Sequence, residues 1–347
     1  MPVDRVLLAS PRGFCAGVEK AIKALAWMVR VFEPPVYCYH EIVHNAVVVE
    51  QFRAQGVHFV DHIDEVPPGR PIMLSAHGSA PEVVTAARAR GGVVIDAVCP
   101  LVTKVHHEVK VRSAKGYTII YVGHEGHEEA VGTMAVAPSR VKLVERRSDV
   151  AKLDIPLGEP IALLTQTTLS QEECMDVIDA AKERYEDLWL PNRSDLCFAT
   201  TNRQGALKAV AAQSDAVIVI GSQNSSNTVA LEKVARASGC KRVIRINGVE
   251  ELPEDLSGVV GVTAGASAPE ALVRAVIEKL NPREGVSELV MTVEAEYFPP
   301  PPELRESVRA LSSLIGLMNA CPTSDYRAAL DEDRNQSAAD ALQLLSP

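Results

Sequence analysis

Three cysteines share one local context that suits metal binding. Cys15, Cys99 and Cys197 each precede a helical pattern, in GFCAGVEKAI, DAVCPLVTKV and DLCFATTNRQ. A thiol at the start of a helix has a lowered pKa, and the thiolate is the form that binds metal. The three lie roughly 100 residues apart, about the length of one small α/β domain each. Taken alone, Cys15 would be interpreted as a small buried side chain; the repeated context favours a shared metal centre.

The wide spacing of these thiols favours one kind of metal centre over another. Structural zinc is usually held by close C-x₂-C pairs. An iron–sulfur cluster held by cysteines from separate segments fits better, and a four-iron cluster with three cysteine ligands leaves one iron open to a substrate. The other cysteines lie in a strand-like run, inside a helix, after a helix end and in the tail, and we expect them to be packing or incidental residues: Cys38, Cys174, Cys240 and Cys321.

Histidines supply a second set of polar groups. All nine lie at or before position 127. A single histidine is usually a buried or capping ring, but His44, His77 and His127 fall in three predicted loops and could offer donors and positive charge to an anion. Two acids, Glu128 and Glu129, follow His127 directly. At a helix start such acids often only offset the dipole; beside a metal and an anion, one could donate a proton.

The elements that position these residues alternate short β-branched runs with helical periodicity, which indicates βαβ units and parallel sheets. In such sheets ligands bind beyond the carboxyl ends of the strands, where helix N-termini suit phosphate. Serine, threonine and asparagine there are also ordinary N-caps. Five units nevertheless share one layout of strand, small polar loop and helix, which favours a common cleft: IMLSAHGSAPEVVTAA, TIIYVGHEGHEEAVGTM, IALLTQTTLSQEECMDVIDAA, AVIVIGSQNSSNTVALEKVA and VVGVTAGASAPEALVRAVIEKL.

Composition excludes several classes of protein. The 347 residues predict two or three domains. A net charge of −10 argues against nucleic acid or an anionic membrane as the main partner. No apolar run approaches the roughly 20 residues of a membrane span, and the N-terminus has no signal-peptide pattern, so we expect a cytoplasmic protein. No G-x-G-x-x-G follows a strand, so a tightly bound flavin or NAD is not indicated.

Nine motifs resemble, in order and spacing, those of the 4-hydroxy-3-methylbut-2-enyl diphosphate reductases, iron–sulfur enzymes of the methylerythritol phosphate route to isoprenoids. The resemblance runs from about position 5 to about position 305 and does not cover the tail after Pro302. The motifs are PRGFCAGV, HEIVHN, SAHG, DAVCPLVTKVH, GHEGHEE, TQTTLS, CFATTNRQ, GSQNSSN and TAGASAP.

The resemblance implies a fold of the α/β class. Three similar small α/β domains with mainly parallel sheets would form a pseudo-threefold trefoil around a central iron–sulfur cluster. We expect the domains at residues 1–98, with the N-terminal strand and Cys15, at 99–196 and at 197–297. Residues 298–347 would be a proline-rich segment and an accessory tail.

The resemblance also implies roles for individual residues. Cys15, Cys99 and Cys197 match the ligands of a [4Fe-4S] cluster with one open iron. Glu129 matches the proton donor, assisted by Thr167 and His127. Glu128 stands where the family commonly has proline, so two neighbouring acids could compete for the role. The positions that match substrate contacts are His44, His77, His127, Thr167, Ser225, Ser226, Asn227 and Ser267.

The implied reaction is a reductive dehydroxylation. 4-Hydroxy-3-methylbut-2-enyl diphosphate would take up two electrons and two protons to give isopentenyl and dimethylallyl diphosphate, with a ferredoxin or flavodoxin as the electron donor. Two other classes of protein stay open: an iron–sulfur sensor without turnover, and a phosphate-binding transferase with structural cysteines.

Overall fold

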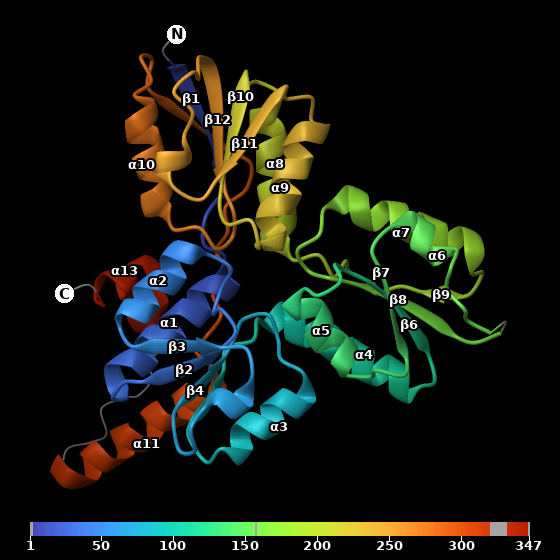
Figure 1. Ribbon diagram of the computed structural model, residues 1–347, viewed down its shortest axis with the longest axis vertical. Helices are drawn as coiled ribbons and strands as arrows, with labels where there is room; N and C mark the ends of the chain where they lie inside the picture. The colour runs from blue at the N-terminus through green and yellow to red at the C-terminus, as the bar shows by residue number, and fades with distance from the viewer. Residues whose placement is uncertain (1–2, 157, 320–331, 346–347) are drawn as a thin grey trace. The chain divides into compact units, whose positions relative to one another are not determined.

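A computed structural model describes residues 3–156, 158–319 and 332–345, so Cys321 lies outside the described residues. The chain forms three parallel β-sheets, each covered by helices (Figure 1). The predicted α/β class with three parallel-sheet domains is therefore confirmed. In the described part of the chain, no helix has both the length and the apolar character to cross a membrane.

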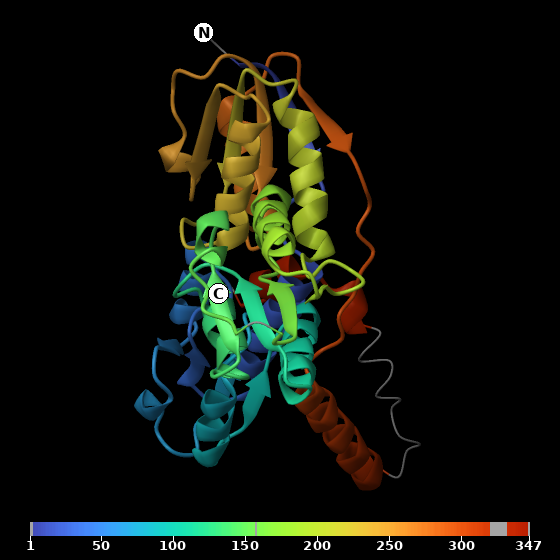
Figure 2. The same ribbon diagram turned by 90° about the vertical axis from the view of Figure 1, so that its right-hand side faces the viewer.

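Sheet A has five strands in the order β11-β10-β12-β1-β13. Helices α8 and α9 cover one face and α10 covers the other (Figure 1). Both faces are therefore buried, which explains why its inner strands are continuous apolar runs. Strand β13 runs along the edge of the sheet (Figure 2). The elements are β1 (Val3–Ser10), α8 (Phe198–Ala211), β10 (Ala216–Ile220), α9 (Ser226–Ala237), β11 (Arg242–Ile246), η2 (Val249–Glu251), β12 (Gly258–Ala264), α10 (Glu270–Leu280) and β13 (Val286–Val290).

Sheet C has four strands in the order β7-β6-β8-β9. Its central strands β6 and β8 are buried throughout and carry the loops that follow them at their carboxyl ends. The elements are α4 (Pro100–Ala114), β6 (Thr118–Val122), α5 (Glu128–Ala135), β7 (Val141–Val144), α6 (Arg147–Val150), β8 (Ile161–Thr165), α7 (Gln171–Arg184) and β9 (Leu188–Trp189).

Sheet B has four strands in the order β3-β2-β4-β5. The C-terminal helices belong to the same compact unit, and α13 packs on α1. The elements are α1 (Ala16–Val31), β2 (Val36–Tyr39), α2 (Ala46–Ala54), β3 (Val57–Val60), η1 (Ile63–Glu65), β4 (Ile72–Leu74), α3 (Pro81–Ala89), β5 (Val94–Asp96), α11 (Pro302–Asn319) and α13 (Ala338–Gln343).

The N-terminal strand lies in a different sheet from the one the sequence suggested. We expected it within a domain of residues 1–98, but β1 pairs in parallel with β12 and β13 of sheet A. Residues 1–15 and 101–294 form one compact unit, which carries sheets A and C; residues 16–100 and 295–347 form the other, which carries sheet B. The reason is burial: Val6, Leu7, Leu8 and Ala9 are all buried, so β1 needs neighbours on both edges and both faces.

Candidate active site

Each of the three cysteines directly precedes or caps a helix. Cys15 is followed by α1 and Cys99 by α4, while Cys197 is the N-cap of α8. The Cys197 sulfur accepts a hydrogen bond from the Thr200 N–H at 3.2 Å and lies 2.9 Å from the Thr200 hydroxyl oxygen. All three are half-buried. The helix-start context predicted from the sequence is present at each.

The backbone N–H of each cysteine donates to a loop that follows another strand of the same unit. Cys15 donates to the Ala266 carbonyl at 3.2 Å, beside Ser267. Cys99 donates to the Ala76 carbonyl at 3.0 Å, beside His77, and Cys197 donates to the Thr167 carbonyl at 3.1 Å. Each cysteine is thereby tied to a loop that carries a residue predicted to contact substrate.

The donor set suits a cluster of soft metal ions. A helix start by itself lowers a thiol pKa, but burial, and to a smaller extent the charge of Cys15 in the same unit, raises the pKa of Cys197 to about 12. A bound cation reverses this balance because it stabilises the thiolate. The remaining described cysteines differ because they are buried: Cys38, Cys174 and Cys240. The three helix-start thiols therefore fit the ligand set of an iron–sulfur cluster.

A buried carboxyl group stands at the first turn of α5. Glu129 is 2% exposed, and its two oxygens accept the Thr167 N–H at 2.8 Å and the Thr167 hydroxyl at 3.0 Å. Burial raises its pKa to about 7, the hydrogen bonds from Thr167 oppose this, and the charge of Asp195 adds to it. Glu129 is therefore poised to exchange a proton near neutral pH.

The two neighbours of Glu129 differ in their roles. His127 is the N-cap of α5, and its Nδ1 accepts the Glu129 N–H at 3.1 Å. A neutral ring with an accepting Nδ1 carries its proton on Nε2. Glu128 is half-buried, whereas Glu129 is buried. The two acids that the sequence left as competitors therefore differ in burial.

The residues predicted to hold the diphosphate gather at the N-terminus of α9. Ser225 is its N-cap, and Ser226 and Asn227 form its first turn. Asn227 is 4% exposed, and among the described residues neither polar atom of its side chain has a hydrogen-bond partner. A buried amide without partners is costly, so the Asn227 side chain is available to bind a polar ligand or a water molecule at this helix start. Ser267 is also buried, in the loop after β12.

Two glycines allow α9 to begin so close to sheet A. A Cβ on Gly265 would lie 2.2 Å from the Thr228 hydroxyl oxygen, and one on Gly221 would lie 2.5 Å from it. Both glycines stand at the carboxyl ends of inner strands, β12 and β10. Both positions need glycine because a side chain there would come too close to the start of α9.

Two polar residues that we did not single out, Gln166 and Thr168, connect the loop after β8 to Ser226 of α9. The Gln166 amide donates to the Thr168 hydroxyl at 3.0 Å and to the Ser226 hydroxyl at 3.1 Å. Its carbonyl oxygen accepts the His124 N–H at 3.0 Å. Gln166 is fully buried, and only the fold shows that it joins loops of sheets A and C. The motif TQTTLS was the one signal in the sequence.

The remaining predicted histidines meet in the unit of sheet B. The rings of His44 and His77 stack, with centroids 4.0 Å apart and an interplanar angle of 15°. His44 precedes α2 and its Nδ1 lies 3.4 Å from a Glu41 carboxylate oxygen; His77 follows β4. Buried Lys20 donates to the Val98 carbonyl at 2.7 Å, next to Cys99. Of the predicted site residues, His44, His77 and Cys99 lie in this unit, and the others lie in the unit of sheets A and C.

Comparison with known proteins places the chain in a family. Residues 6–281 match the LytB protein family. A curated relative from Rhodopirellula baltica, 4-hydroxy-3-methylbut-2-enyl diphosphate reductase, is 47% identical over 306 residues, which is 87% of this chain and 96% of the relative. A relative from Mycobacterium bovis, named 4-hydroxy-3-methylbut-2-enyl diphosphate reductase 2, is 47% identical over 298 residues, 84% of this chain and 90% of its own.

A solved structure agrees with these matches. The E-1-hydroxy-2-methyl-but-2-enyl-4-diphosphate reductase from Plasmodium falciparum aligns with a TM-score of 0.86 at 30% identity and covers 89% of this chain and 99% of its own. The matched region includes all three helix-start cysteines, Glu129 and the loop before α9. The chain is therefore a member of the LytB protein family.

Proposed function

We propose that this protein catalyses the reductive dehydroxylation of 4-hydroxy-3-methylbut-2-enyl diphosphate to isopentenyl and dimethylallyl diphosphate. Its curated relatives carry the name of this reductase. The observation that carries the proposal is the buried Glu129–Thr167 pair, whose carboxyl group has a pKa of about 7. In the reaction the C–O bond breaks, the hydroxyl leaves as water after taking one proton, and the allyl group takes two electrons and the second proton.

Cys15, Cys99 and Cys197 would hold a [4Fe-4S] cluster with one iron free of protein ligands. When bound, the cluster would supply electrons singly and an iron that acts as a Lewis acid toward the substrate hydroxyl. The electrons would come from a ferredoxin or flavodoxin.

Glu129 would supply the proton that turns the hydroxyl into a leaving water. The Thr167 hydroxyl donates to one Glu129 oxygen. When that oxygen carries the proton this hydrogen bond reverses, so that the Thr167 oxygen can take the proton while it donates its own hydrogen onward. His127 holds the start of α5 through the Glu129 N–H and thereby orients the acid. Such positioned proton transfer contributes about 10²- to 10⁴-fold to a rate.

The diphosphate would be bound by donors that are largely neutral. Ser225, Ser226 and Asn227 stand at the N-terminus of a twelve-residue helix, whose dipole and unpaired N–H groups attract phosphate. Ser267, His44 and His77 would complete the set. Anchoring the unreactive end of the substrate lowers the entropic cost of holding the hydroxyl in a reactive position.

The test begins with the protein purified without oxygen. We expect a brown protein with about four irons and four sulfides per chain, since a [4Fe-4S] cluster contains these numbers. With dithionite and a viologen as reductant it should convert the allylic diphosphate to both products. A colourless protein without iron would instead support a phosphate-binding transferase. A coloured protein with neither diphosphate affinity nor turnover would support an iron–sulfur sensor.

A further inference from the structure

One buried charged residue in the unit of sheets A and C has no part in the proposed reaction. Arg203 lies on α8, and at 1% exposed it is the largest fully buried side chain among the described residues. Burying a guanidinium is costly unless every N–H finds an acceptor and the charge finds a partner. The contacts of Arg203 therefore indicate which parts of the chain it holds in place.

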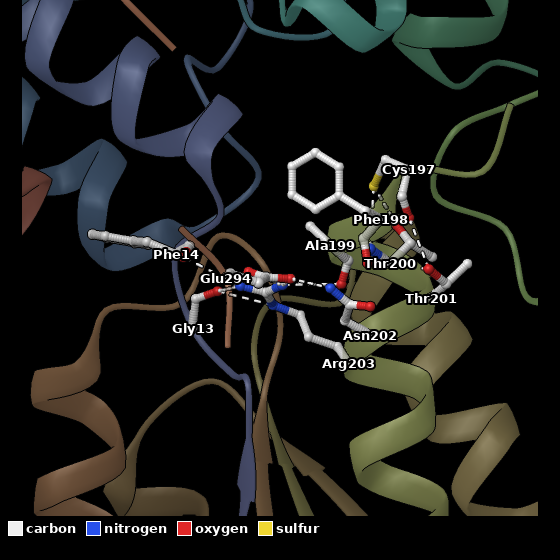
Figure 3. A network of polar contacts seen from close by, with 10 residues as sticks. All are labelled: Gly13, Phe14, Cys197, Phe198, Ala199, Thr200, Thr201, Asn202, Arg203 and Glu294. Carbon is white, nitrogen blue, oxygen red and sulfur yellow. Dashed lines mark hydrogen bonds and ion pairs between the residues drawn. The ribbon is translucent and has the colours of Figure 1, made fainter. Parts of the chain in front are cut away.

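All five N–H groups of Arg203 are used. Nε and Nη2 both donate to the Gly13 carbonyl, at 3.1 and 2.8 Å, and Nη2 also donates to the Phe14 carbonyl at 3.2 Å. Nη1 donates to the Ala199 carbonyl at 2.9 Å and to both oxygens of Glu294 at 3.0 Å. Figure 3 shows the guanidinium between the Gly13–Phe14 backbone and the first turn of α8.

These contacts join the turns that present two of the three thiols. Gly13 and Phe14 immediately precede Cys15, and Ala199 lies in the first turn of α8, which Cys197 caps. The Cys15 N–H is held by Ala266. The Cys15 backbone is therefore fixed by Arg203 just before the residue and by Ala266 at the residue itself.

The turn before Cys15 has little room to adopt another backbone conformation. Gly13 has a φ of +65°, which favours glycine, and a Cβ there would lie 3.2 Å from the Ala268 carbonyl oxygen. Its own N–H donates to the Ala264 carbonyl at 3.2 Å. The turn is therefore clamped between the loop after β12 on one side and Arg203 on the other.

A carboxylate completes the arrangement. Glu294 follows β13, and one of its oxygens also accepts the Asn202 amide at 3.0 Å. It neutralises Arg203, because the single nitrogen Nη1 donates to both carboxylate oxygens. A lysine could not reproduce this clamp, because its single ammonium nitrogen cannot present five donors in a planar fork.

We propose that Arg203, held by Glu294, is a positioning residue that sets the geometry of Cys15 relative to Cys197 and so controls how firmly the iron–sulfur cluster is retained. This inference rests on the proposed function, since it presumes that these two cysteines bind the cluster. Residues that orient metal ligands commonly contribute about 10- to 100-fold to metal affinity.

The test compares Arg203→Lys with the wild-type protein after anaerobic cluster reconstitution. We measure iron and sulfide per chain, the rate of iron loss to a chelator, and the electron paramagnetic resonance spectrum of the reduced cluster. We expect iron loss about 10-fold faster or more and an altered spectrum. The control is Arg184→Lys, because Arg184 also clamps two carbonyls, those of Val150 and Leu153, at 2.8 Å each, without touching either cysteine turn. It should behave as the wild type does.

A second variant keeps the proposal testable if Arg203→Lys destabilises the chain. Glu294→Gln retains the shape of the side chain, but its neutral amide is a weaker acceptor for Arg203 Nη1, so the guanidinium is held less firmly against the Cys15 turn. We expect iron loss to be several-fold faster with circular dichroism unchanged. Iron loss and spectra equal to wild type in both variants would overturn the inference. A wild-type protein that binds no iron would instead overturn the proposed function.

Discussion

Among single residues, the proposed reaction depends on a carboxyl group that can hold a proton near neutral pH. Glu129 and Glu128 are adjacent in the chain and both belong to the first turn of α5. Glu129 is buried against Thr167 and has a pKa raised to about 7, whereas Glu128 is half-buried. Burial, not position along the helix, therefore distinguishes the two acids.

Exchange of the two acids for amides should separate their roles. Glu129→Gln keeps the size of the side chain and one accepting oxygen but has no carboxyl proton, so we expect turnover to fall by about 10²-fold or more. Glu128→Gln should be much milder. Both are measured anaerobically at matched iron content. A silent Glu129→Gln together with a crippled Glu128→Gln would reverse the assignment, and activity lost only in the double variant would mean that either acid can serve.

The pH dependence of turnover should report the same carboxyl group. A pKa raised to about 7 means that Glu129 carries its proton below pH 7 and loses it above, so the proton-donating form disappears as the pH rises and turnover should fall through this range. The hydrogen bond from the Thr167 hydroxyl lowers this pKa. Thr167→Val should therefore reduce turnover and move the alkaline limb to higher pH. A shift to lower pH would contradict this electrostatic account.

At the scale of elements, the recurring unit is a strand whose following loop feeds a helix N-terminus. The three such starts that carry Cys15, Cys99 and Cys197 each donate a cysteine N–H to a loop with a predicted substrate contact. The prediction that these three cysteines bind metal therefore depends on their position at helix starts.

Serine substitutions should divide the cysteines into two groups. We expect Cys15→Ser, Cys99→Ser and Cys197→Ser each to remove most iron and activity, because serine is a poor substitute for a thiolate ligand. The matched controls at Cys38, Cys174 and Cys240 should keep both, since these thiols are buried in packing positions. Iron content and anaerobic turnover are the measurements. Full iron content in any of the first three variants would contradict its role as a ligand.

The start of α9 offers a second test at this scale. Gly265→Ala would bring a Cβ to within 2.2 Å of the Thr228 hydroxyl oxygen, so the Thr228 side chain or the first turn of the helix must shift. We expect the KM for the diphosphate substrate to rise by about 10-fold, since a displaced anchor loses orientation, with iron content unchanged. Gly205→Ala in α8 is the control, because nothing lies within 4 Å of its Cβ; it should stabilise the chain by up to about 1 kcal/mol. An unchanged KM in Gly265→Ala would separate this helix start from substrate binding.

At the scale of the whole molecule, the C-terminal segment belongs to the unit of sheet B. Lys23 on α1 pairs with the Asp333 carboxylate at 3.0 Å, and the Ala338 N–H donates to Glu19. The Tyr297 hydroxyl also donates to Asp333 at 2.8 Å. The C-terminal segment therefore packs on α1, the helix that follows Cys15.

Truncation should show what the tail contributes. A chain that ends at Asn319 loses the contacts of Asp333 and Ala338 but keeps Leu304, which is 4% exposed. We expect its turnover and iron content to match those of the full chain, with a melting temperature lower by a few degrees. A chain that ends at Pro301 also exposes the apolar surface under Leu304 and should be less stable and less soluble. A large fall in turnover by the folded 1–319 chain would mean that the tail acts on the site.

The features that could be predicted from the sequence are local in origin. Strand, polar loop and helix start are encoded within about twenty residues, so the α/β class, the three helix-start cysteines and the loops around Glu129 and Asn227 could be predicted from periodicity, capping residues and family motifs. The features that could be found only from the fold depend on residues far apart in the chain. Strand β1 joined sheet A because its buried faces needed β12 and β13, and Arg203 meets Gly13 across 190 positions. The pKa of Glu129 follows from the same cause: desolvation is set by everything that packs around a group, and no spacing in the sequence encodes it.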